Sequence, residues 1–496
     1  MQSGGTVLKG VLTASYTRSC TNRPFLLEST IRAILTAPNI RMQLLGILKS
    51  FGRKLGEKPN LQSHETYLDA IVGRARKVFA LLVLCNQEPF IFDFVQTGID
   101  DSRLPLTRSQ TASIPGIPDI VFEKQWEVQA QVFTRGCDLD LPSSVILPFT
   151  SEDFLGKGVD RITLPTEHAI NFGQSMDQNP SHQPSIVVAR KTIATKEAAK
   201  SDQRSLQDAF QREKSVLQRL LSLGTGHRHL VELFACYRLD SSYYLLLTCA
   251  DYDLETLFRE PSRRLDFGLT SEQQCATLYG CFYCLASALD YLHRLPVYHP
   301  GLDLDEIIYH HDLKPANILI RGNTFMIADF GLSGLKQQDD TKTDWHGGTY
   351  SYSPPEYFSS ANITLASGGR KVDVWGLGCI FSELLTFIVL ENVTNGVSNF
   401  KRMREEGPSK HLFSPGAPDS SFHNNLPEVR SWLSTVLAED DRSPIATLVV
   451  ELIEETLNID PVKRPSAEVV SERLTRILSD DQLRICGCGS RPAGTD

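Results

Sequence analysis

One stretch in the second half of the chain decides the fold: His310-His311-Asp312-Leu313-Lys314-Pro315-Ala316-Asn317-Ile318-Leu319-Ile320. It places a carboxylate at Asp312, an ammonium group at Lys314 and a carboxamide at Asn317 ahead of an apolar run. Asp329, which opens an Asp-Phe-Gly triplet, follows twelve positions after Asn317. Residues 318–328 read as two strands joined by a turn, so a hairpin is expected to bring Asp329 back towards Asn317.

This stretch resembles the catalytic loop of protein kinases. Phosphoryl transfer needs a carboxylate that orients the accepting hydroxyl and takes its proton, and the resemblance assigns this role to Asp312. It also needs oxygen ligands for the Mg²⁺ that neutralises the phosphates of ATP, and these are assigned to Asn317 and Asp329. Lys314 matches the serine/threonine branch of the family, in which its ammonium group stabilises the γ-phosphate.

A second stretch, residues 348–356, resembles the end of a kinase activation segment. The resemblance implies that the hydroxyl of Thr349 ties together the carboxylate and the ammonium group of the catalytic loop. It implies further that Asp373 holds the backbone of that loop. Arg464 is expected to pair with Glu356 in a buried, charge-assisted bridge.

The nucleotide side of the expected site lies upstream. Lys191 ends a Val-Ala-Arg-Lys run that matches the strand whose lysine contacts the α- and β-phosphates of ATP. Lys191 then needs a carboxylate partner, for which Glu213 is the better placed candidate and Glu197 the alternative. The hinge between the lobes is expected around Cys249, with Leu247 controlling the back of the nucleotide pocket.

The loop that should cover the phosphates matches the family least well. Gly156 and Gly158 supply two of its glycines, but Arg161 occupies the third glycine position. Arg161 is expected either to reduce the affinity for ATP or to meet the phosphates with its own charge. Insertions relative to the family are expected at 168–183, 294–305 and 390–441.

A second departure from the family is His311, where many kinases carry an arginine that grips a phosphorylated activation segment. A neutral imidazole lacks the bidentate fork of arginine, so phosphorylation of Thr341 or Thr343 should not be required for catalysis. The alternative is that another cation takes this role, from Arg161, Lys336 or Lys342. A metal site at His310 and His311 is disfavoured, because adjacent residues of an extended segment point apart.

Together these features predict the α+β class, with a bilobal protein kinase fold over residues 146–478 that has a small β-rich lobe and a larger helical lobe. Residues 1–117 show apolar residues at helical spacing and are expected to form a small, mainly helical region of unknown role. Residues 118–145 are interpreted as a linker or loop, and residues 479–496 as a tail. The arrangement also resembles fungal kinase-like proteins with an uncharacterised N-terminal region, and a protein partner for that region is the working hypothesis.

The composition is that of a globular protein: 496 residues, 41% hydrophobic and 22% charged. The formal net charge of -9 disfavours a nucleic-acid partner. The longest apolar run, 372–390, contains Asp373 and Glu383, so it is expected to be a buried helix and not a membrane span. The 11 cysteines show no framework spacing, which suits the cytoplasm or nucleus. A mitochondrial location is the alternative, because residues 1–27 are rich in Ser and Thr and lack acids.

The sequence therefore predicts a protein serine/threonine kinase that uses ATP and Mg²⁺ and acts on Ser or Thr of a protein substrate. An alternative is a pseudokinase, an ATP-binding scaffold in which the altered phosphate loop abolishes turnover. A kinase of small molecules is disfavoured by residues 349–356, which in protein kinases shape the platform for the peptide.

Overall fold

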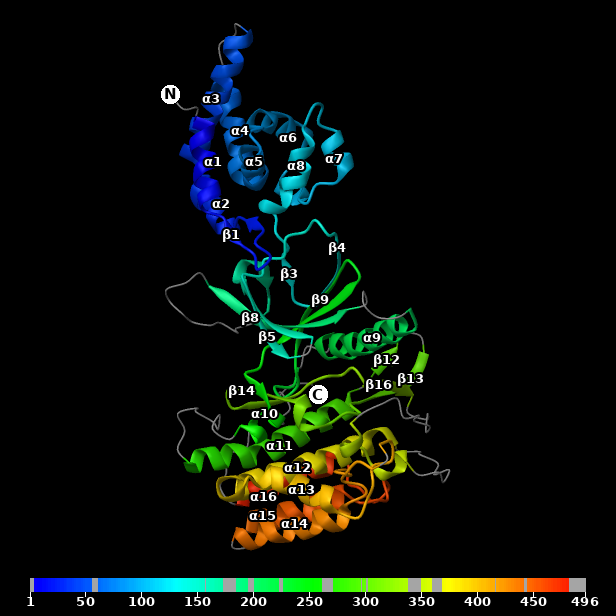
Figure 1. Ribbon diagram of the computed structural model, residues 1–496. Helices are drawn as coiled ribbons and strands as arrows, with labels where there is room; N and C mark the ends of the chain where they lie inside the picture. The colour runs from blue at the N-terminus through cyan, green and yellow to red at the C-terminus, as the bar shows by residue number, and fades with distance from the viewer. Residues whose placement is uncertain are drawn as a thin grey trace, which may run out of the picture. The chain divides into compact units, whose positions relative to one another are not determined.

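The chain folds into two compact units, which comprise residues 1–196 with 234–247 and residues 197–233 with 248–496 (Figure 1). The computed structural model describes residues 4–480, apart from 56–60, 157, 173–183, 195–199, 223–225, 261–270, 296, 300–301, 338–348, 359–367, 415 and 441–443.

The first unit begins with a group of helices around one apolar core. Its central helix is α5 (Arg76–Leu84), in which all seven residues from Val78 to Leu84 are buried. A helix that is apolar on every side needs partners on every side, and α5 packs against five neighbouring helices of this group. The other helices are α1 (Gly4–Ala14), α2 (Glu28–Ile34), α3 (Ala37–Leu55), α4 (Leu61–Arg74), α6 (Ile91–Thr97), α7 (Arg108–Ala112) and α8 (Asp119–Lys124). The helical N-terminal region expected from the sequence is confirmed.

The same unit contains a six-stranded sheet with the strand order β4-β9-β10-β8-β6-β5 (Figure 1). Its strands are β4 (Cys137–Leu141), β5 (Ser151–Gly156), β6 (Val159–Pro165), β8 (Ser185–Ala194), β9 (Leu233–Leu239) and β10 (Ser242–Thr248). Strands β5, β6 and β8 pair antiparallel, whereas β4 runs parallel to β9. Two short pairs accompany the sheet, β1 (Thr17–Arg18) with β2 (Pro24–Phe25) and β3 (Phe133–Thr134) with β7 (Ala169–Ile170).

The helices and the sheet of this unit are joined through a shared core. Phe25, Leu27 and Trp126 from the helical region belong to the same buried cluster as Phe149 and Tyr237 of the sheet region. Residues 118–145, interpreted from the sequence as a linker or loop, contain α8, β3 and β4. This stretch is therefore part of a folded unit and not a linker. Its apolar residues pack into the core that the sheet shares with the helical region, although turn-forming residues precede them.

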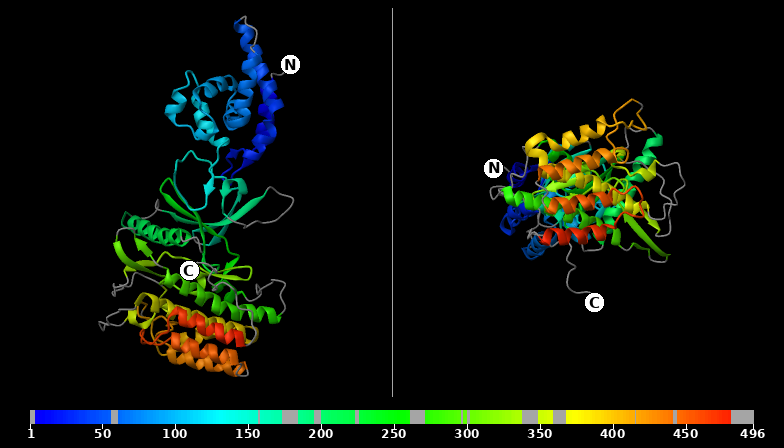
Figure 2. Two further views of the ribbon diagram at one scale, coloured as in Figure 1. Left: turned by 180° about the vertical axis from the view of Figure 1, so that it is seen from behind. Right: turned by 90° about the horizontal axis from the view of Figure 1, so that it is seen from below.

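The second unit is mainly helical, and its helices α11, α12, α14, α15 and α16 lie side by side (Figures 1 and 2). Its helices are α9 (Lys200–Ser222), α10 (Leu254–Arg259), α11 (Ser271–Arg294), α12 (Gly368–Thr394), α13 (Gly396–Glu406), α14 (Leu426–Glu439), α15 (Pro444–Thr456) and α16 (Ala467–Asp480). Two three-stranded sheets complete the unit, with the orders β11-β14-β15 and β12-β13-β16. Their strands are β11 (Tyr252–Asp253), β12 (Val297–His299), β13 (Leu302–Tyr309), β14 (Ile318–Arg321), β15 (Thr324–Ile327) and β16 (Gly334–Gln337).

Helices α11 and α12 form the centre of the second unit. By length and composition, 275–294 and 369–390 would each suffice to cross a membrane, but 72% and 89% of their apolar windows are buried inside the protein. The burial of Trp375 and Phe381 in α12 agrees with the buried helix that was expected there. The α+β class with a β-rich part and a larger helical part is thus confirmed.

Candidate active site

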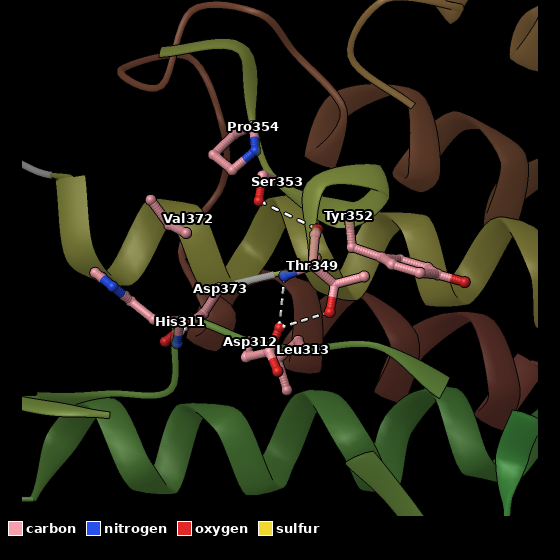
Figure 3. Close-up of a pocket in the computed structure, with 10 residues that line it drawn as sticks. His311, Asp312, Leu313, Thr349, Tyr352, Ser353, Pro354, Val372 and Asp373 are labelled. Carbon is pink, nitrogen blue, oxygen red and sulfur yellow. Dashed lines mark hydrogen bonds between the residues drawn. The ribbon is translucent and has the colours of Figure 1, made fainter. Parts of the chain in front are cut away.

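The four predicted catalytic residues meet at the carboxylate of Asp312, which is 9% exposed. Figure 3 shows two of them, Asp312 and Thr349, with the hydrogen bonds between them as dashed lines. The backbone N–H and the hydroxyl of Thr349 both donate to Asp312 Oδ1, at 2.9 and 3.0 Å. On the other oxygen, Oδ2, Lys314 Nζ lies at 2.7 Å and Asn317 Nδ2 at 3.1 Å. The carboxylate is therefore fixed by donors on both oxygens before any ligand binds.

The hydroxyl of Thr349 links the two charged groups of the catalytic loop. It donates to Asp312 and accepts a hydrogen bond of 2.8 Å from Lys314 Nζ. The three side chains thus form a closed triangle of hydrogen bonds, and the tie expected from the sequence is confirmed.

The backbone of the catalytic loop is held by the buried carboxylate of Asp373 on α12. Its oxygens accept from the backbone N–H groups of His310 and His311, at 2.8 and 2.7 Å. Burial would raise the pKa of Asp373, but the hydrogen bond to His293 (2.9 Å) and nearby histidine charges outweigh burial and lower it. His311 has a φ of +67°, a strained conformation for a non-glycine residue, and the two bonds to Asp373 stabilise it. The support role predicted for Asp373 is confirmed.

Helix α12 approaches the catalytic loop closely because it carries glycine at position 376. A Cβ atom there would lie 2.9 Å from Cβ of Leu313, closer than two such atoms can pack. The absence of a side chain at Gly376 therefore lets α12 support the loop directly.

The expected hairpin after the catalytic loop is present. Strands β14 and β15 pair antiparallel with Ile318 opposite Ile327, and the N–H of Ala328 donates to the carbonyl oxygen of Asn317 at 2.9 Å. This brings Asp329, the residue after Ala328, next to the catalytic loop. Like His311, Asp329 has a φ of +67°. The hairpin therefore places Asn317 and Asp329, which are twelve positions apart in the sequence, at the same end of the loop.

His310 connects the catalytic loop to the Asp-Phe-Gly triplet. Its Nε2 lies 2.9 Å from the carbonyl oxygen of Ala328, and its ring packs 5.2 Å from the ring of Phe330. These contacts agree with the packing role expected for His310.

Glu213 lies on α9 and is 2% exposed. A Cβ atom built on Gly331 would be 3.3 Å from Asp329 Oδ1 and 3.7 Å from Glu213 Oε2. The carboxylate of Glu213 therefore lies beside the Asp-Phe-Gly triplet. The alternative, Glu197, falls outside the described residues.

The predicted phosphate-contacting residues lie on the sheet of the first unit. Lys191 is on β8, opposite Val159 of β6. Gly156 ends β5, and Gly158 lies in the turn before β6 with a φ of +73°, where a Cβ would be 3.2 Å from the carbonyl oxygen of Thr192. The positive φ and this close contact both favour glycine at position 158. The pairing of Lys191 with Glu213 remains a prediction.

The predicted hinge coincides with a passage between the two units. Leu247, 9% exposed on β10, is the last residue of the first unit, and the chain returns to the second unit at Thr248. Cys249 follows directly. Contacts of Leu247 and Cys249 with a nucleotide remain predictions.

The donors at Asn317 and Asp329 fit a magnesium ion. The amide nitrogen of Asn317 bonds both the carbonyl oxygen and the carboxylate of Asp312, so its side-chain oxygen is the atom that can bind a metal. Carboxylate and amide oxygens are ligands that Mg²⁺ prefers, usually completed by water and phosphate.

The bridge between Glu356 and Arg464 is present as expected. Both guanidinium nitrogens of Arg464 donate to the carboxylate, at 2.6 and 2.7 Å, and the two side chains are 1% and 0% exposed. The guanidinium also lies 4.9 Å from the ring centre of Trp375. The pair anchors the end of the activation segment to the helical core.

His311 is enclosed by aromatic side chains. The ring of Tyr309 lies at 4.1 Å, and the hydroxyl of Tyr357 is 3.3 Å from Nδ1. Thr341, Thr343 and Lys342 fall outside the described residues, as does the side chain of Lys336, so the predictions about them stand as predictions.

A buried network that was not predicted from the sequence lies next to the site. The hydroxyl of Tyr352 donates to Glu383 at 2.9 Å, and Arg404 donates to the same carboxylate at 3.0 Å. An acid inside the apolar run 372–390 was a signal that a buried partner exists. Nothing in the sequence identified that partner as Arg404, because it lies within an insertion without a motif.

Comparison with known proteins places this site in a family. The model of the protein kinase domain matches residues 181–474, more than half of the chain. The chain is 28% identical over 302 residues to the serine/threonine-protein kinase cds1 of Schizosaccharomyces pombe, covering 54% of this chain and 56% of that protein. It is 27% identical over 282 residues to the dual specificity protein kinase Ttk of Danio rerio, covering 55% of this chain and 25% of that protein. It is 33% identical over 169 residues to the mitogen-activated protein kinase HOG1 of Phaeosphaeria nodorum, covering 32% and 44%.

These alignments span from a quarter to just over half the length of the relatives. The matched region contains the catalytic loop, the Asp-Phe-Gly triplet and the Glu356–Arg464 bridge. The chain therefore belongs to the protein kinase family.

Proposed function

We propose that this protein transfers the γ-phosphoryl group of ATP to serine or threonine hydroxyls of a protein substrate, with Mg²⁺ as the metal. The observation that carries the proposal is the triangle of Asp312, Lys314 and Thr349. A lysine two positions after the catalytic aspartate, bonded to a threonine hydroxyl, is the arrangement that the serine/threonine branch resemblance implies.

In the transfer step Asp312 and Lys314 have different roles. A substrate hydroxyl that reaches Asp312 gives its proton to the carboxylate as the oxygen bonds to phosphorus and the bond to ADP breaks. Lys314 supports the negative charge on the transferred group from the same side. Because Asp312 is already oriented by Thr349 and Asn317, little reorganisation is needed when the substrate binds.

On the nucleotide side, Lys191 would hold the α- and β-phosphates and Glu213 would orient it. Asn317 and Asp329 would bind Mg²⁺, which supplies charge neutralisation between the phosphates when bound. The location of the protein inside the cell and a protein partner for residues 1–117 remain predictions.

A second candidate function rests on Arg161. It lies on β6, opposite Asp153 of β5 and Ala189 of β8, where the family pattern has a glycine. If its bulk prevents close approach of the backbone to the phosphates, the protein would be a scaffold without turnover. The retained Lys191, Asp312 and Asp329 favour the enzyme.

The test is an assay of purified protein with Mg²⁺, labelled ATP and a generic protein substrate, followed by phospho-amino-acid analysis. We expect phosphoserine and phosphothreonine, and no signal from the Asp312→Asn variant, which conserves the size of the side chain. Phosphotyrosine alone would contradict the serine/threonine assignment. Nucleotide binding without any transfer would favour the scaffold.

A further inference from the structure

The segment between α13 and α14, of which the structure describes residues 407–414 and 416–425, lies against the end of the activation segment. Three consecutive residues of the activation segment contact it. Tyr350 and Ser351 bond to the segment itself, and Tyr352 bonds to Glu383, which also binds Arg404 just before that segment. The three residues follow directly after Thr349, whose hydroxyl contacts Asp312. Whatever fixes these three residues therefore also fixes the position of Thr349.

The first contact is made by Tyr350. Its hydroxyl donates to the carboxylate of Asp419 at 3.4 Å, and accepts from Asn424 Nδ2 at 3.1 Å and from the N–H of Leu412 at 3.4 Å. Asp419 is fully buried; burial favours its neutral form, but the bonds from Asn424 and Ser421 outweigh this and lower its pKa. An ionised acceptor strengthens the bond from the tyrosine.

The ring of Tyr350 is surrounded as well. Rings from the inserted segment lie 4.2 to 5.6 Å from it, and that of Phe358 lies at 5.1 Å. The three rings of the inserted segment are those of His411, Phe413 and His423. The side chain of Tyr350 is therefore held both at its hydroxyl and around its ring.

The second contact runs through the backbone. The N–H of Phe422 donates to the carbonyl oxygen of Ser351 at 3.0 Å, and the hydroxyls of Ser351 and Ser420 lie 3.2 Å apart. A backbone bond fixes the register of the two segments.

The third contact is the buried network of Tyr352, Glu383 and Arg404. The guanidinium of Arg404 lies between the rings of Phe400 and Phe422, at 4.2 and 4.0 Å, and its Nε donates to the carbonyl oxygen of Ser420 at 3.0 Å. Arg404 and Glu383 are 2% and 5% exposed at the side chain, so both charges depend on each other inside the core. This network anchors the inserted segment and Tyr352 to α12 together.

We infer that residues 407–414 and 416–425 form a permanent clamp that holds Thr349 against Asp312, with Tyr350 as a positioning residue, so that turnover does not require phosphorylation of the activation segment. The inference rests on the proposed kinase activity for its effect on rate. In many kinases a phosphate and an arginine order this segment. Here His311 replaces that arginine, and the clamp supplies the order through aromatic rings, one buried ion pair and hydrogen bonds of the backbone.

The test uses Tyr350→Phe, which removes the hydroxyl and keeps the ring. We expect kcat to fall about tenfold, as the loss of hydrogen bonds to a buried charge and an amide implies. The KM for ATP should stay unchanged, because the hydroxyl of Tyr350 bonds to Leu412, Asp419 and Asn424, none of which is a predicted nucleotide contact. Asn424→Ala, at an exposed position, should lower kcat in the same direction but less. The matched control is Tyr67→Phe, which loses the bond from Gln96 in the helical region and should leave kcat unchanged.

Phosphatase treatment of the wild-type protein should leave the initial rate within about threefold. A wild-type kcat in Tyr350→Phe, or a loss of more than tenfold on phosphatase treatment, would overturn the clamp. Hydrogen exchange tests it independently of activity: the amide of Thr349, bonded to Asp312, should exchange several times faster in Tyr350→Phe than in wild type. If the wild type transfers no phosphate, the proposed function fails, and unchanged exchange would then reject the clamp separately.

Discussion

Breaking the Glu356–Arg464 pair should strongly destabilise the second unit. The change is Glu356→Gln, which keeps the shape of the side chain and removes its charge. In the wild type two bonds of 2.6 and 2.7 Å join side chains that are 1% and 0% exposed. Removing one partner leaves the Arg464 charge buried without its counterion, at a cost of about 3–5 kcal/mol. The remaining acceptors of Arg464, the carbonyl oxygens of Asn458 and Lys371, stay in place and keep the loss near the lower figure.

The measurement is urea unfolding followed by tryptophan fluorescence, since Trp375 packs on Arg464. The matched control is Glu405→Gln, which removes the exposed ion pair with Lys401 at 3.8 Å and should change the free energy of unfolding by less than about 0.5 kcal/mol. The double variant Glu356→Gln/Arg464→Met should be more stable than the sum of the single variants implies, because it leaves no unpaired charge. A loss below about 1 kcal/mol in Glu356→Gln would refute the reasoning.

Three further predictions follow from the site. Thr349→Ser should keep near wild-type kcat, whereas Thr349→Ala should lower kcat ten- to hundredfold. The reason is that the hydroxyl makes hydrogen bonds with two charged groups, and such bonds contribute about 1.5–3 kcal/mol. Equal initial rates in the two variants would contradict this role. Burial lowers the pKa of His423 from 6.5 to about 4, and the charge of Asp419 partly opposes this. Between pH 6.5 and pH 4 the folded state therefore binds fewer protons than the unfolded state. The free energy of unfolding should therefore fall as the pH drops from 6.5 to 4, by up to about 3 kcal/mol, and His423→Asn should remove that part of the slope in urea titrations at several pH values. Lys191→Met should abolish transfer and Glu213→Gln should slow it less; initial rates check this, and a wild-type rate in Glu213→Gln would remove Glu213 from the site.

The catalytic residues could be predicted because each is required by the chemistry at a fixed spacing. Asp312, Asn317 and Asp329 lie on one loop and one hairpin, so local sequence determines how they meet. The clamp could not be predicted in this way. Tyr350 and Asp419 are 69 residues apart, and aromatic residues in an insertion have no period that reveals their partners.

The linker assignment failed for a related reason. Proline, serine, threonine and glycine are frequent before residue 118, which is typical of a loop. Burial of Trp126 (8% exposed) depends on the sheet that follows, and composition alone cannot reveal such a long-range contact.

The shared core of the first unit makes the stability of the sheet depend on the helical N-terminal region. Because Phe25, Leu27 and Trp126 help to fill the core of the sheet, a shortened chain that starts at residue 146 would begin with an open apolar face. Such a face associates with other molecules or aggregates. Loss of residues 1–145 should therefore destabilise the sheet that carries Lys191, although it removes none of the predicted catalytic residues.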